Sequence, residues 1–269
     1  MYHQVYGHPA NPFIKYSNFY KFARIYIYIT LKYLHGFNTK DYSDGQQGIL
    51  EAMKPYTISF TQKEAGYKVN TNEKVLEVTL KPSTYKLCKQ LKKDLIIEGK
   101  KEVLLADTGV KLMSKLHQLY SGTVKFESGN SMVVDLSKAI YIKDHFEGKK
   151  IGIFYKFKAE LKALQEVFQD SLCTTLDEFN TTSKNIALQI VSGREGISLK
   201  EAECLVYYNI DFSATSYWQS RDRMTTKDRL FNHIYWIFSK HGIENKIYKA
   251  VSRKKDYTLQ HFKRDLLTL

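Results

Sequence analysis

Cysteine is scarce in this 269-residue sequence, and its scarcity excludes several kinds of site. The three cysteines, Cys88, Cys173 and Cys204, are far apart and form no C-x-x-C pair. An odd, isolated set of this kind does not build the disulfide framework of a secreted domain and favours a reducing, cytoplasmic setting. The eight histidines are scattered without the spacing of zinc ligands, so we expect no metal site made of protein ligands alone.

Long hydrophobic runs are missing as well. The most apolar early segment, residues 25–31, is too short to span a bilayer and is followed by Lys32. Residues 1–20 contain Pro9 and Pro12 and lack the continuous apolar stretch of a signal peptide. We therefore expect neither a membrane-spanning helix nor a membrane partner.

A phosphate-binding P-loop is also absent. That motif, G-x-x-x-x-G-K-[ST], needs glycines for close backbone approach to phosphates and a hydroxyl group for magnesium. Residues 99–101 and 148–150, both Gly-Lys-Lys, are near-matches that lack the upstream glycine and the following Ser or Thr. No acidic pair of the D-E-x-H kind ends a predicted strand. By itself, the chain is not expected to hold ATP and Mg²⁺.

Basic residues are abundant: 41 Lys and Arg stand against 28 Asp and Glu, for a formal net charge of +13. Such an excess favours polyanionic partners, above all nucleic acid, because neutralised phosphates release their counterions. A basic surface that only maintains solubility is the alternative. Hydrophobic residues make up 43% of the chain, enough for a packed core.

The first third of the chain differs in composition from the rest, because it contains all four prolines. Residues 16–34 predict a helix and residues 75–80 a strand, and apolar spacing predicts two further helices, one from Thr84 and one around residues 110–120. Gly122 and Gly129 then interrupt the pattern. We place a domain boundary there, with residues 1–122 as one domain and residues 123–269 as the other.

After Gly129, short apolar runs alternate with helical patterns. The runs cover residues 151–155, 186–191, 204–208 and 234–238, and residues 160–168 form an amphipathic pattern. This alternation predicts βαβ units and a parallel sheet covered by helices on both faces. Residues 244–265 predict a basic helix at the C-terminus.

Three segments follow predicted strands, where ligands of open parallel sheets bind. They are Tyr155 with Lys156, the glycine-containing residues 191–199, and the arginine-rich residues 217–229. Glycines let the backbone approach a phosphate, and guanidinium groups bind it. Taken singly, each segment is also typical of an ordinary turn or a solvated helix.

The order of these segments resembles that of a known family. Residues 192–202 are similar to motif V of superfamily 2 helicases, and Gln219 with Arg223 is similar to motif VI, Q-x-x-x-R-x-x-R. Lys156, after the strand at 151–155, stands where motif IV would lie. The match is to the second RecA-like domain of Swi/Snf-type DNA translocases in their phage-like form.

This resemblance implies a fold and partners. The implied fold is α/β, a RecA-like parallel sheet with flanking helices in residues 123–269, ending in the basic helix. Residues 1–122 would be a mostly helical remnant of the first helicase domain. ATP and Mg²⁺ would bind only together with the missing N-terminal RecA-like domain, which is one expected partner. DNA is the other, with RNA as the alternative.

The resemblance also assigns residues to ATP. Arg223 is expected at the γ-phosphate, with Gly196 and Gln219 near the nucleotide. The family's second motif VI arginine is replaced by Thr226, so Arg229, one helical turn further, is the candidate to take its catalytic role.

Tyr155, Lys156, Ser192 and Gly193 are expected to contact the phosphate backbone of one nucleic-acid strand. The implied function is that of the C-terminal portion of an ATP-dependent DNA helicase or translocase, inactive alone. Two alternatives stay open: a stand-alone nucleic-acid-binding module, and a partner-binding domain with decayed motifs, which Thr226 favours.

Overall fold

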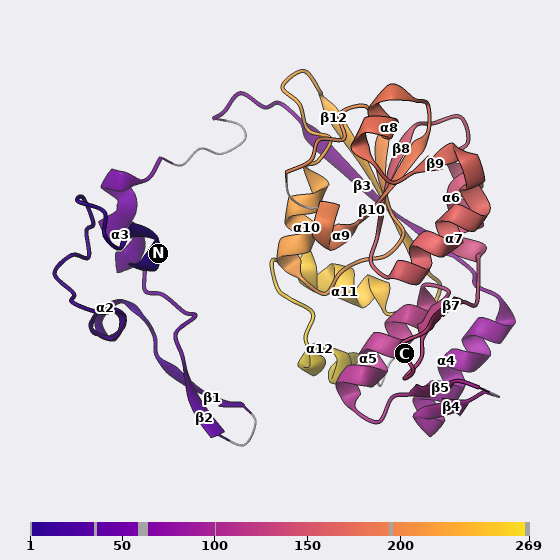
Figure 1. The fold of residues 1–269 in the computed structure, drawn as a ribbon, viewed down its shortest axis with the longest axis horizontal. Coiled ribbons are helices and arrows are strands. Elements are labelled where there is room, and N and C mark those ends of the chain that lie inside the picture. The colour runs from indigo at the N-terminus through magenta and orange to yellow at the C-terminus, as the bar shows by residue number, and fades with distance from the viewer. Residues whose placement is uncertain (1, 35–36, 59–63, 100, 194–195, 267–269) are drawn as a thin grey trace. The chain divides into compact units, whose positions relative to one another are not determined.

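The computed structural model describes residues 2–34, 37–58, 64–99, 101–193 and 196–266, which divide into two compact units. The smaller unit is Met1–Ala65 and the larger unit is Gly66–Leu269 (Figure 1). Each unit has a hydrophobic core of its own.

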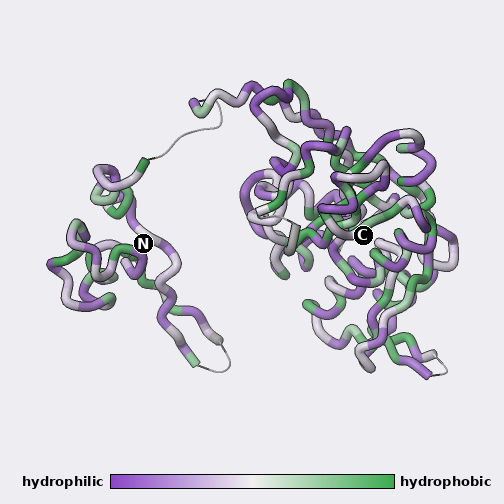
Figure 2. Tube along the Cα trace, turned by 45° about the horizontal axis from the view of Figure 1, so that its top comes forward, coloured by the Kyte–Doolittle hydropathy of each residue, from purple (hydrophilic) through white to green (hydrophobic). Residues whose placement is uncertain are grey.

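The smaller unit combines short helices with a β-hairpin. Its elements are α1 (Tyr2–Val5), α2 (Phe19–Tyr26), β1 (Thr30–Leu34), β2 (Phe37–Asp41), α3 (Gly48–Met53) and a 3₁₀ turn at Lys54–Tyr56. The side chain of Asn18 caps α2 by accepting from the backbone N–H of Lys21. Hydrophobic and hydrophilic residues are interspersed along this unit (Figure 2).

The helix predicted over residues 16–34 is wrong in its second half. Helix α2 ends at Tyr26, and β1 then pairs antiparallel with β2. Thr30, Leu31, Lys32 and Tyr33 alternate in polarity, which is a strand pattern. Leu31 and Tyr33 are nevertheless exposed.

A parallel sheet forms the centre of the larger unit (Figure 1). Among the described residues it has six strands in the order β3-β12-β11-β8-β10-β9, and every pairing is parallel. The strands are β3 (Asn70–Val78), β8 (Ile151–Tyr155), β9 (Leu172–Cys173), β10 (Asn185–Gln189), β11 (Cys204–Tyr207) and β12 (Phe231–Ser239). The predicted strands at 151–155, 186–191, 204–208 and 234–238 are thus confirmed, with the second ending early at Gln189.

Helices cover both faces of this sheet. The helices of the larger unit are α4 (Pro82–Asp94), α5 (Gly109–Tyr120), α6 (Ser137–His145), α7 (Lys158–Phe168), α8 (Leu176–Thr181), α9 (Ile190–Gly193), α10 (Ala214–Arg221), α11 (Glu244–Val251) and α12 (Leu259–Leu266). A 3₁₀ turn, Gln169–Ser171, and two hairpins, β4 (Ile96–Glu98) with β5 (Val103–Leu105) and β6 (Thr123–Lys125) with β7 (Ser131–Val133), complete the unit.

Side chains that alternate along the strands pack into two hydrophobic cores, one on each face of the sheet. Ile151 and Ile153 of β8 pack in the cluster that contains α6 and α7 residues, whereas Phe154 belongs to the cluster of α5, α11 and α12. This follows from the two-residue period of a strand. The predicted fold class, a parallel α/β sheet with flanking helices, is therefore confirmed.

The boundary predicted between residues 122 and 123 falls inside the larger unit. Strand β3 pairs with β12 along its whole length, from Asn70 with Phe231 to Val78 with Ser239. Gly122 is no linker residue either: it has φ +79°, and a Cβ atom there would lie 2.3 Å from the carbonyl oxygen of Asp135. Residues 66–122 therefore fold with the sheet.

The C-terminal segment is helical but not continuous. Helices α11 and α12 are separated by residues 252–258, where the backbone N–H of Tyr257 donates to the carbonyl of Phe212 at 2.8 Å. Of the helices in the described ranges, none combines the length and apolarity needed to cross a membrane.

Candidate nucleotide and nucleic-acid interface

Lys156 lies at the carboxyl edge of the sheet, directly after β8. Its ammonium group forms a salt bridge with Asp211, which follows β11, and lies 4.1 Å from the ring centroid of Phe212. Burial raises the pKa of the Asp211 carboxyl, but the charge and hydrogen bond of Lys156 outweigh it, so the net pKa is lowered. The lysine predicted to hold a phosphate is thus already paired with a carboxylate.

A cavity of about 340 Å³ opens beside Lys156. Lys125, Lys156 and Lys158 line it together with the polar side chains of Ser131 and Gln189, and its lining contains no Asp or Glu in the part of the chain that the structure describes. Lys125 and Lys158 are exposed. Lys156 is already paired with Asp211, so the charge that this cavity offers to a phosphate comes from the exposed Lys125 and Lys158.

Two backbone N–H groups just before α7 are already bonded to a carboxylate. The carboxylate of Glu160 accepts from the backbone N–H groups of Lys156 at 2.7 Å and Phe157 at 2.9 Å. Glu160 is fully buried, and burial raises the pKa of its carboxyl.

A buried polar network lies directly behind this edge. The Nε2 atom of His117 lies 2.6 Å from Oδ1 of Asn209, which also accepts from the N–H of Ile210, and Asn209 Nδ2 donates to Glu160 at 2.6 Å. Since Oδ1 only accepts, Nε2 carries the proton, and the buried Nδ1 has no hydrogen-bond partner among the described residues. Burial, with help from the charge of Lys156, lowers the pKa of His117.

Sequence reasoning missed His117. The available signal was its position four residues after Met113, on the inward face of the predicted helix. Its partner Asn209 carried no local signal, because the two are 92 residues apart.

The other residues predicted to contact the phosphate backbone of a nucleic acid are only partly brought to this edge. Tyr155 is half-buried and packs in the cluster of α6 and α7, and burial raises the pKa of its hydroxyl. Ser192 and Gly193 end helix α9, just after β10. Residues 194–195 of the predicted motif V lie outside the described residues. Gly196 is exposed with φ +70°, a conformation that suits glycine.

The arginine-rich segment, residues 217–229, was predicted to follow a strand at the carboxyl edge of the sheet. The structure does not place it there as a loop. Residues 214–221 form helix α10, and the chain then returns toward the amino ends of β11 and β12. Arg223 is half-buried there: its Nε donates to the carbonyl of Gln219 at 3.0 Å, and its own carbonyl accepts from Leu199 at 2.7 Å. One further N–H points to the carbonyl of Ile197 at 3.5 Å. The segments predicted as motifs V and VI therefore lie against each other.

Arg229 is turned inward. Its guanidinium donates to the carbonyl oxygens of Ala202 at 2.7 Å, Lys200 at 3.2 Å, Met224 at 3.3 Å and Glu203 at 3.4 Å. Burial lowers the pKa of this group. These bonds fasten the chain before β11 to the chain before β12, and they leave few N–H groups for a phosphate.

Gln219 and its neighbour Arg221 differ in their surroundings. The Oε1 atom of Gln219 is buried and has no hydrogen-bond partner among the described residues. Arg221 forms a salt bridge with Glu73 of β3 and lies 4.7 Å from a ring of Trp218. Glu73 also accepts from Tyr217, Trp236 and Tyr248. Arg221 therefore anchors α10 to the edge strand, a role that its local sequence did not reveal.

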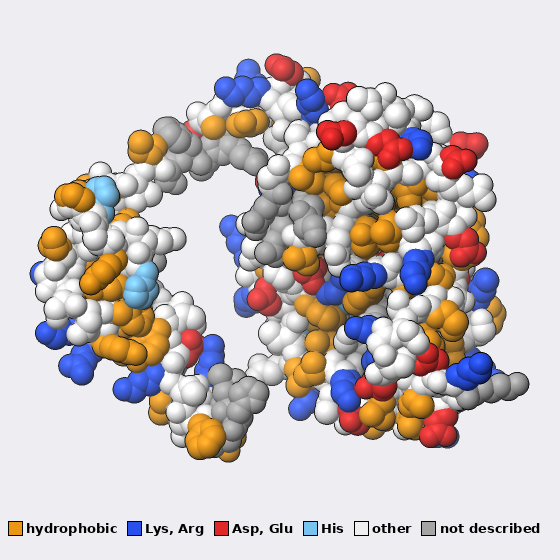
Figure 3. All heavy atoms as spheres, viewed as in Figure 1, with side chains coloured by type: hydrophobic (Ala, Val, Ile, Leu, Met, Phe, Trp, Pro, Cys, Tyr) orange, Lys and Arg blue, Asp and Glu red, His pale blue; other side chains and the backbone are white. Residues whose placement is uncertain are grey.

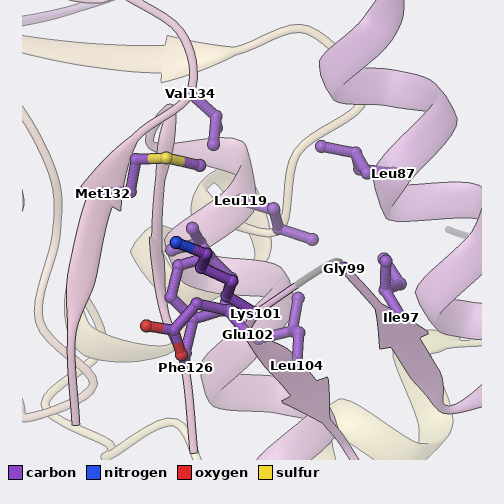
Figure 4. Close-up of a pocket in the computed structure, with 11 residues that line it drawn as sticks. Leu87, Ile97, Gly99, Lys101, Glu102, Leu104, Leu119, Phe126, Met132 and Val134 are labelled. Atoms are coloured by element: carbon purple, nitrogen blue, oxygen red, sulfur yellow. The ribbon is translucent and has the colours of Figure 1, made fainter. Parts of the chain in front are cut away.

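A second cavity, also of about 340 Å³, is apolar (Figure 4). Leu87 of α4, Leu119 of α5, Ile97 and Leu104 of the β4–β5 hairpin, and Met132 of β7 point into it. The described ranges contain no cluster of three or more His, Cys, Asp or Glu residues that could hold a metal ion.

Solved structures give the comparison with known proteins. The chain is similar to SWI2/SNF2 ATPase cores. The Sulfolobus solfataricus core in complex with dsDNA shares 14% identity with a TM-score of 0.45, and the match covers 82% of this chain and 52% of that one. A second structure of this core shares 16% identity with a TM-score of 0.45, over 77% of this chain and 48% of that one. The C-terminal part of the Fun30 ATPase domain shares 21% identity with a TM-score of 0.35, over 46% of this chain and 45% of that one.

This chain thus spans about half the length of each of these structures. No protein-family model and no curated protein matches the sequence.

Proposed function

We propose that this chain is the C-terminal portion of a Swi/Snf-type, ATP-dependent DNA helicase or translocase. The observation that carries the proposal is the contact between residues 197–199 and Arg223. These two segments were assigned to motifs V and VI from sequence order alone, and they share hydrogen bonds in the folded chain. The phage-like form of the family remains a prediction.

In this proposal Arg223 acts on the nucleotide phosphates. It forms no ion pair with a carboxylate within the described residues, so its charge is available to an anion. Gln219, with its unpartnered Oε1, and Gly196 would lie near the nucleotide. ATP would supply the free energy of hydrolysis, and its Mg²⁺ ligands would come from the N-terminal RecA-like domain.

DNA would lie at the carboxyl edge, against the cavity of Lys125, Lys156 and Lys158. Phosphate contacts by lysines are independent of base sequence, so we expect weak, non-specific binding that falls with salt. The logarithm of the affinity should fall by about 0.9 per contacted phosphate for each tenfold rise in salt on duplex DNA.

Fluorescence anisotropy with labelled duplex DNA at several salt concentrations tests this interface. The variant Lys125→Gln/Lys158→Gln should bind more weakly and with a shallower salt slope, because two phosphate contacts are lost. The control, Lys93→Gln/Lys162→Gln, removes the same charge from exposed positions outside this cavity and should bind as the parent does. Equal weakening of both variants would contradict the placement of DNA at this edge.

A stand-alone nucleic-acid-binding module is the second candidate. The inward-facing guanidinium of Arg229 favours it, because that arginine is then structural. Addition of the matching N-terminal domain distinguishes the two. DNA-stimulated phosphate release that is lost in Arg223→Ala supports the translocase, whereas absence of turnover with DNA binding intact supports the module.

A further inference from the structure

The largest of the cavities described lies at the carboxyl ends of β3 and β12, away from the residues discussed above. Its volume is about 720 Å³. Thr79 and Leu80 enter it after β3, Lys240 and His241 after β12, and one face of α4 completes the wall. In open parallel sheets this edge is where ligands bind.

Its charges are of one sign. Lys86, Lys89 and Lys92 follow one another at three-residue intervals along α4, and Lys240 and His241 stand on the β12 side. None of the described residues that line the cavity is a carboxylate. Within the described part of the chain, Lys86, Lys89 and Lys240 form no ion pair. Four ammonium groups around one space repel one another, and a bound anion would remove that repulsion.

The walls between these charges are apolar. Leu80, Pro82 and Tyr120 line the cavity, and the rings of Tyr85 and His241 stand 6.5 Å apart, edge to face. The ammonium of Lys92 lies 5.7 Å from the centroid of Tyr120. Burial, together with the nearby charges of Lys246 and Lys89, lowers the pKa of Lys92. A ligand that fits has a flat or apolar body as well as a negative charge.

Hydrogen bonds fix the shape of this cavity. The hydroxyl of Tyr85 donates to the carbonyl of Lys240 at 3.1 Å and accepts from the N–H of Leu80 at 3.2 Å, so α4 is tied to both strand ends. Behind it, the carboxylate of Asp135 accepts from the N–H of Lys81 and the hydroxyl of Thr84, each at 2.7 Å. The lysines are therefore carried on a fixed frame.

We propose that this cavity binds a nucleotide, with the lysines on its phosphate and the rings and apolar walls against its base and sugar. A lone phosphate would leave most of the volume and all of the apolar wall unused, whereas small-molecule sites have volumes of about 300–1,000 Å³. A free mononucleotide and the terminal nucleotide of a strand share this chemistry.

The cavity is separate from the arginine segment. Strand β12 has nine residues and runs from the side of Arg229 to Lys240. At about 3.3 Å per residue, the two ends of the strand are roughly 26 Å apart. The cavity also shares no lining residue with the cavity of Lys125, Lys156 and Lys158, so it can exist without the proposed function.

Isothermal titration calorimetry on the full chain at fixed ionic strength tests the proposal. The probes are AMP, ADP, ATP, adenosine, inorganic phosphate, and an oligonucleotide with and without a 5′-phosphate. The test variant is Lys86→Gln/Lys89→Gln, at two exposed positions on α4. The matched control is Lys93→Gln/Lys162→Gln, which removes the same charge outside this cavity and includes one position on the same helix.

We expect saturable binding of at least one mononucleotide, weakened at least tenfold in the test variant and less than twofold in the control. Binding of the 5′-phosphorylated oligonucleotide alone, with the same lysine dependence, identifies a strand end as the source. The proposal is overturned if no phosphorylated probe binds, if adenosine binds as well as AMP, if both lysine variants lose affinity equally, or if only Arg223→Ala loses it.

Discussion

The guanidinium of Arg229 donates to four carbonyl oxygens, and this predicts a measurable contribution to folding. Removing a half-buried charged donor leaves these carbonyls with fewer partners, so Arg229→Ala should lower the free energy of unfolding by about 2 kcal/mol. Urea denaturation measures it. Arg253 is exposed, and Arg253→Ala should change the free energy by less than about 0.5 kcal/mol. Equal, small effects of both substitutions would mean that Arg229 does not act as a clamp.

His117 predicts how stability depends on pH. Its pKa is lowered in the folded state, chiefly by burial, so the unfolded chain takes up a proton first as pH falls. The contribution of this group is therefore complete above the unfolded pKa, about 6.5, and is lost below it, by about 1.4 kcal/mol per pH unit. Glu160, whose pKa is raised, acts in the opposite direction.

The comparison with His117→Gln isolates the histidine. The difference in unfolding free energy between parent and variant should shrink, or reverse in sign, between pH 7.5 and pH 5.5. Only the parent has an imidazole that stays neutral in the folded chain and takes up a proton in the unfolded chain. A difference that does not vary with pH would show that the imidazole titrates normally in the folded chain.

At this scale the sequence was informative about residue type and uninformative about partners. Lys156 was identified as a candidate because it follows a strand, but its ion pair with Asp211 joins positions 55 residues apart. In the same way, the family resemblance placed Arg229 near phosphate as a substitute for the arginine missing at Thr226, and its carbonyl partners became visible only in the folded chain.

At the scale of elements, a buried ion pair joins α6 to α11. Lys138 and Glu244 are 2.7 Å apart and fully buried, and Glu244 also accepts from Ser239. Lys138→Met leaves a buried carboxylate without its cation, so the unfolding free energy should fall by about 3–5 kcal/mol. Adding Glu244→Gln removes that charge and should recover at least about 1 kcal/mol. A single substitution costing less than about 1 kcal/mol would show that water reaches the pair.

The elements that were predicted well are those with a strong internal pattern. The apolar run at 151–155 becomes β8 with those bounds, since a strand buried on both faces needs only hydrophobic residues. The helix prediction over residues 16–34 was wrong in its second half because aromatic and β-branched residues suit a strand as well as a helix. Local sequence does not decide between the two.

At the scale of the whole molecule, the domain boundary was the least predictable feature. Strand β3 was recognised as a strand, but its partner β12 lies about 160 residues later, and the pairing of parallel strands leaves no local trace. Gly122 was interpreted as a break between two domains. In the structure a glycine is required at this position because the backbone packs closely against Asp135. The concentration of prolines in the first third of the chain indicated two regions, but it did not locate the division between Ala65 and Gly66.

The two units have separate cores, and this predicts that the larger one folds alone. The core of the smaller unit contains buried residues between Tyr2 and Ile49, and the two clusters of the larger unit contain none before Val78. Both tryptophans of the chain, Trp218 and Trp236, are in the larger unit, so tryptophan fluorescence follows its unfolding only.

Removal of residues 1–65 should therefore leave the midpoint of the thermal fluorescence transition within about 2 °C of that of the full chain, since 1 kcal/mol corresponds to about 2–4 °C at this size. The β1–β2 hairpin exposes Tyr33 at 73% and Phe37 at 75%, so the truncated chain should also be more soluble. A midpoint lowered by more than about 5 °C would instead mean that the smaller unit stabilises the sheet, and that the two cores are not independent.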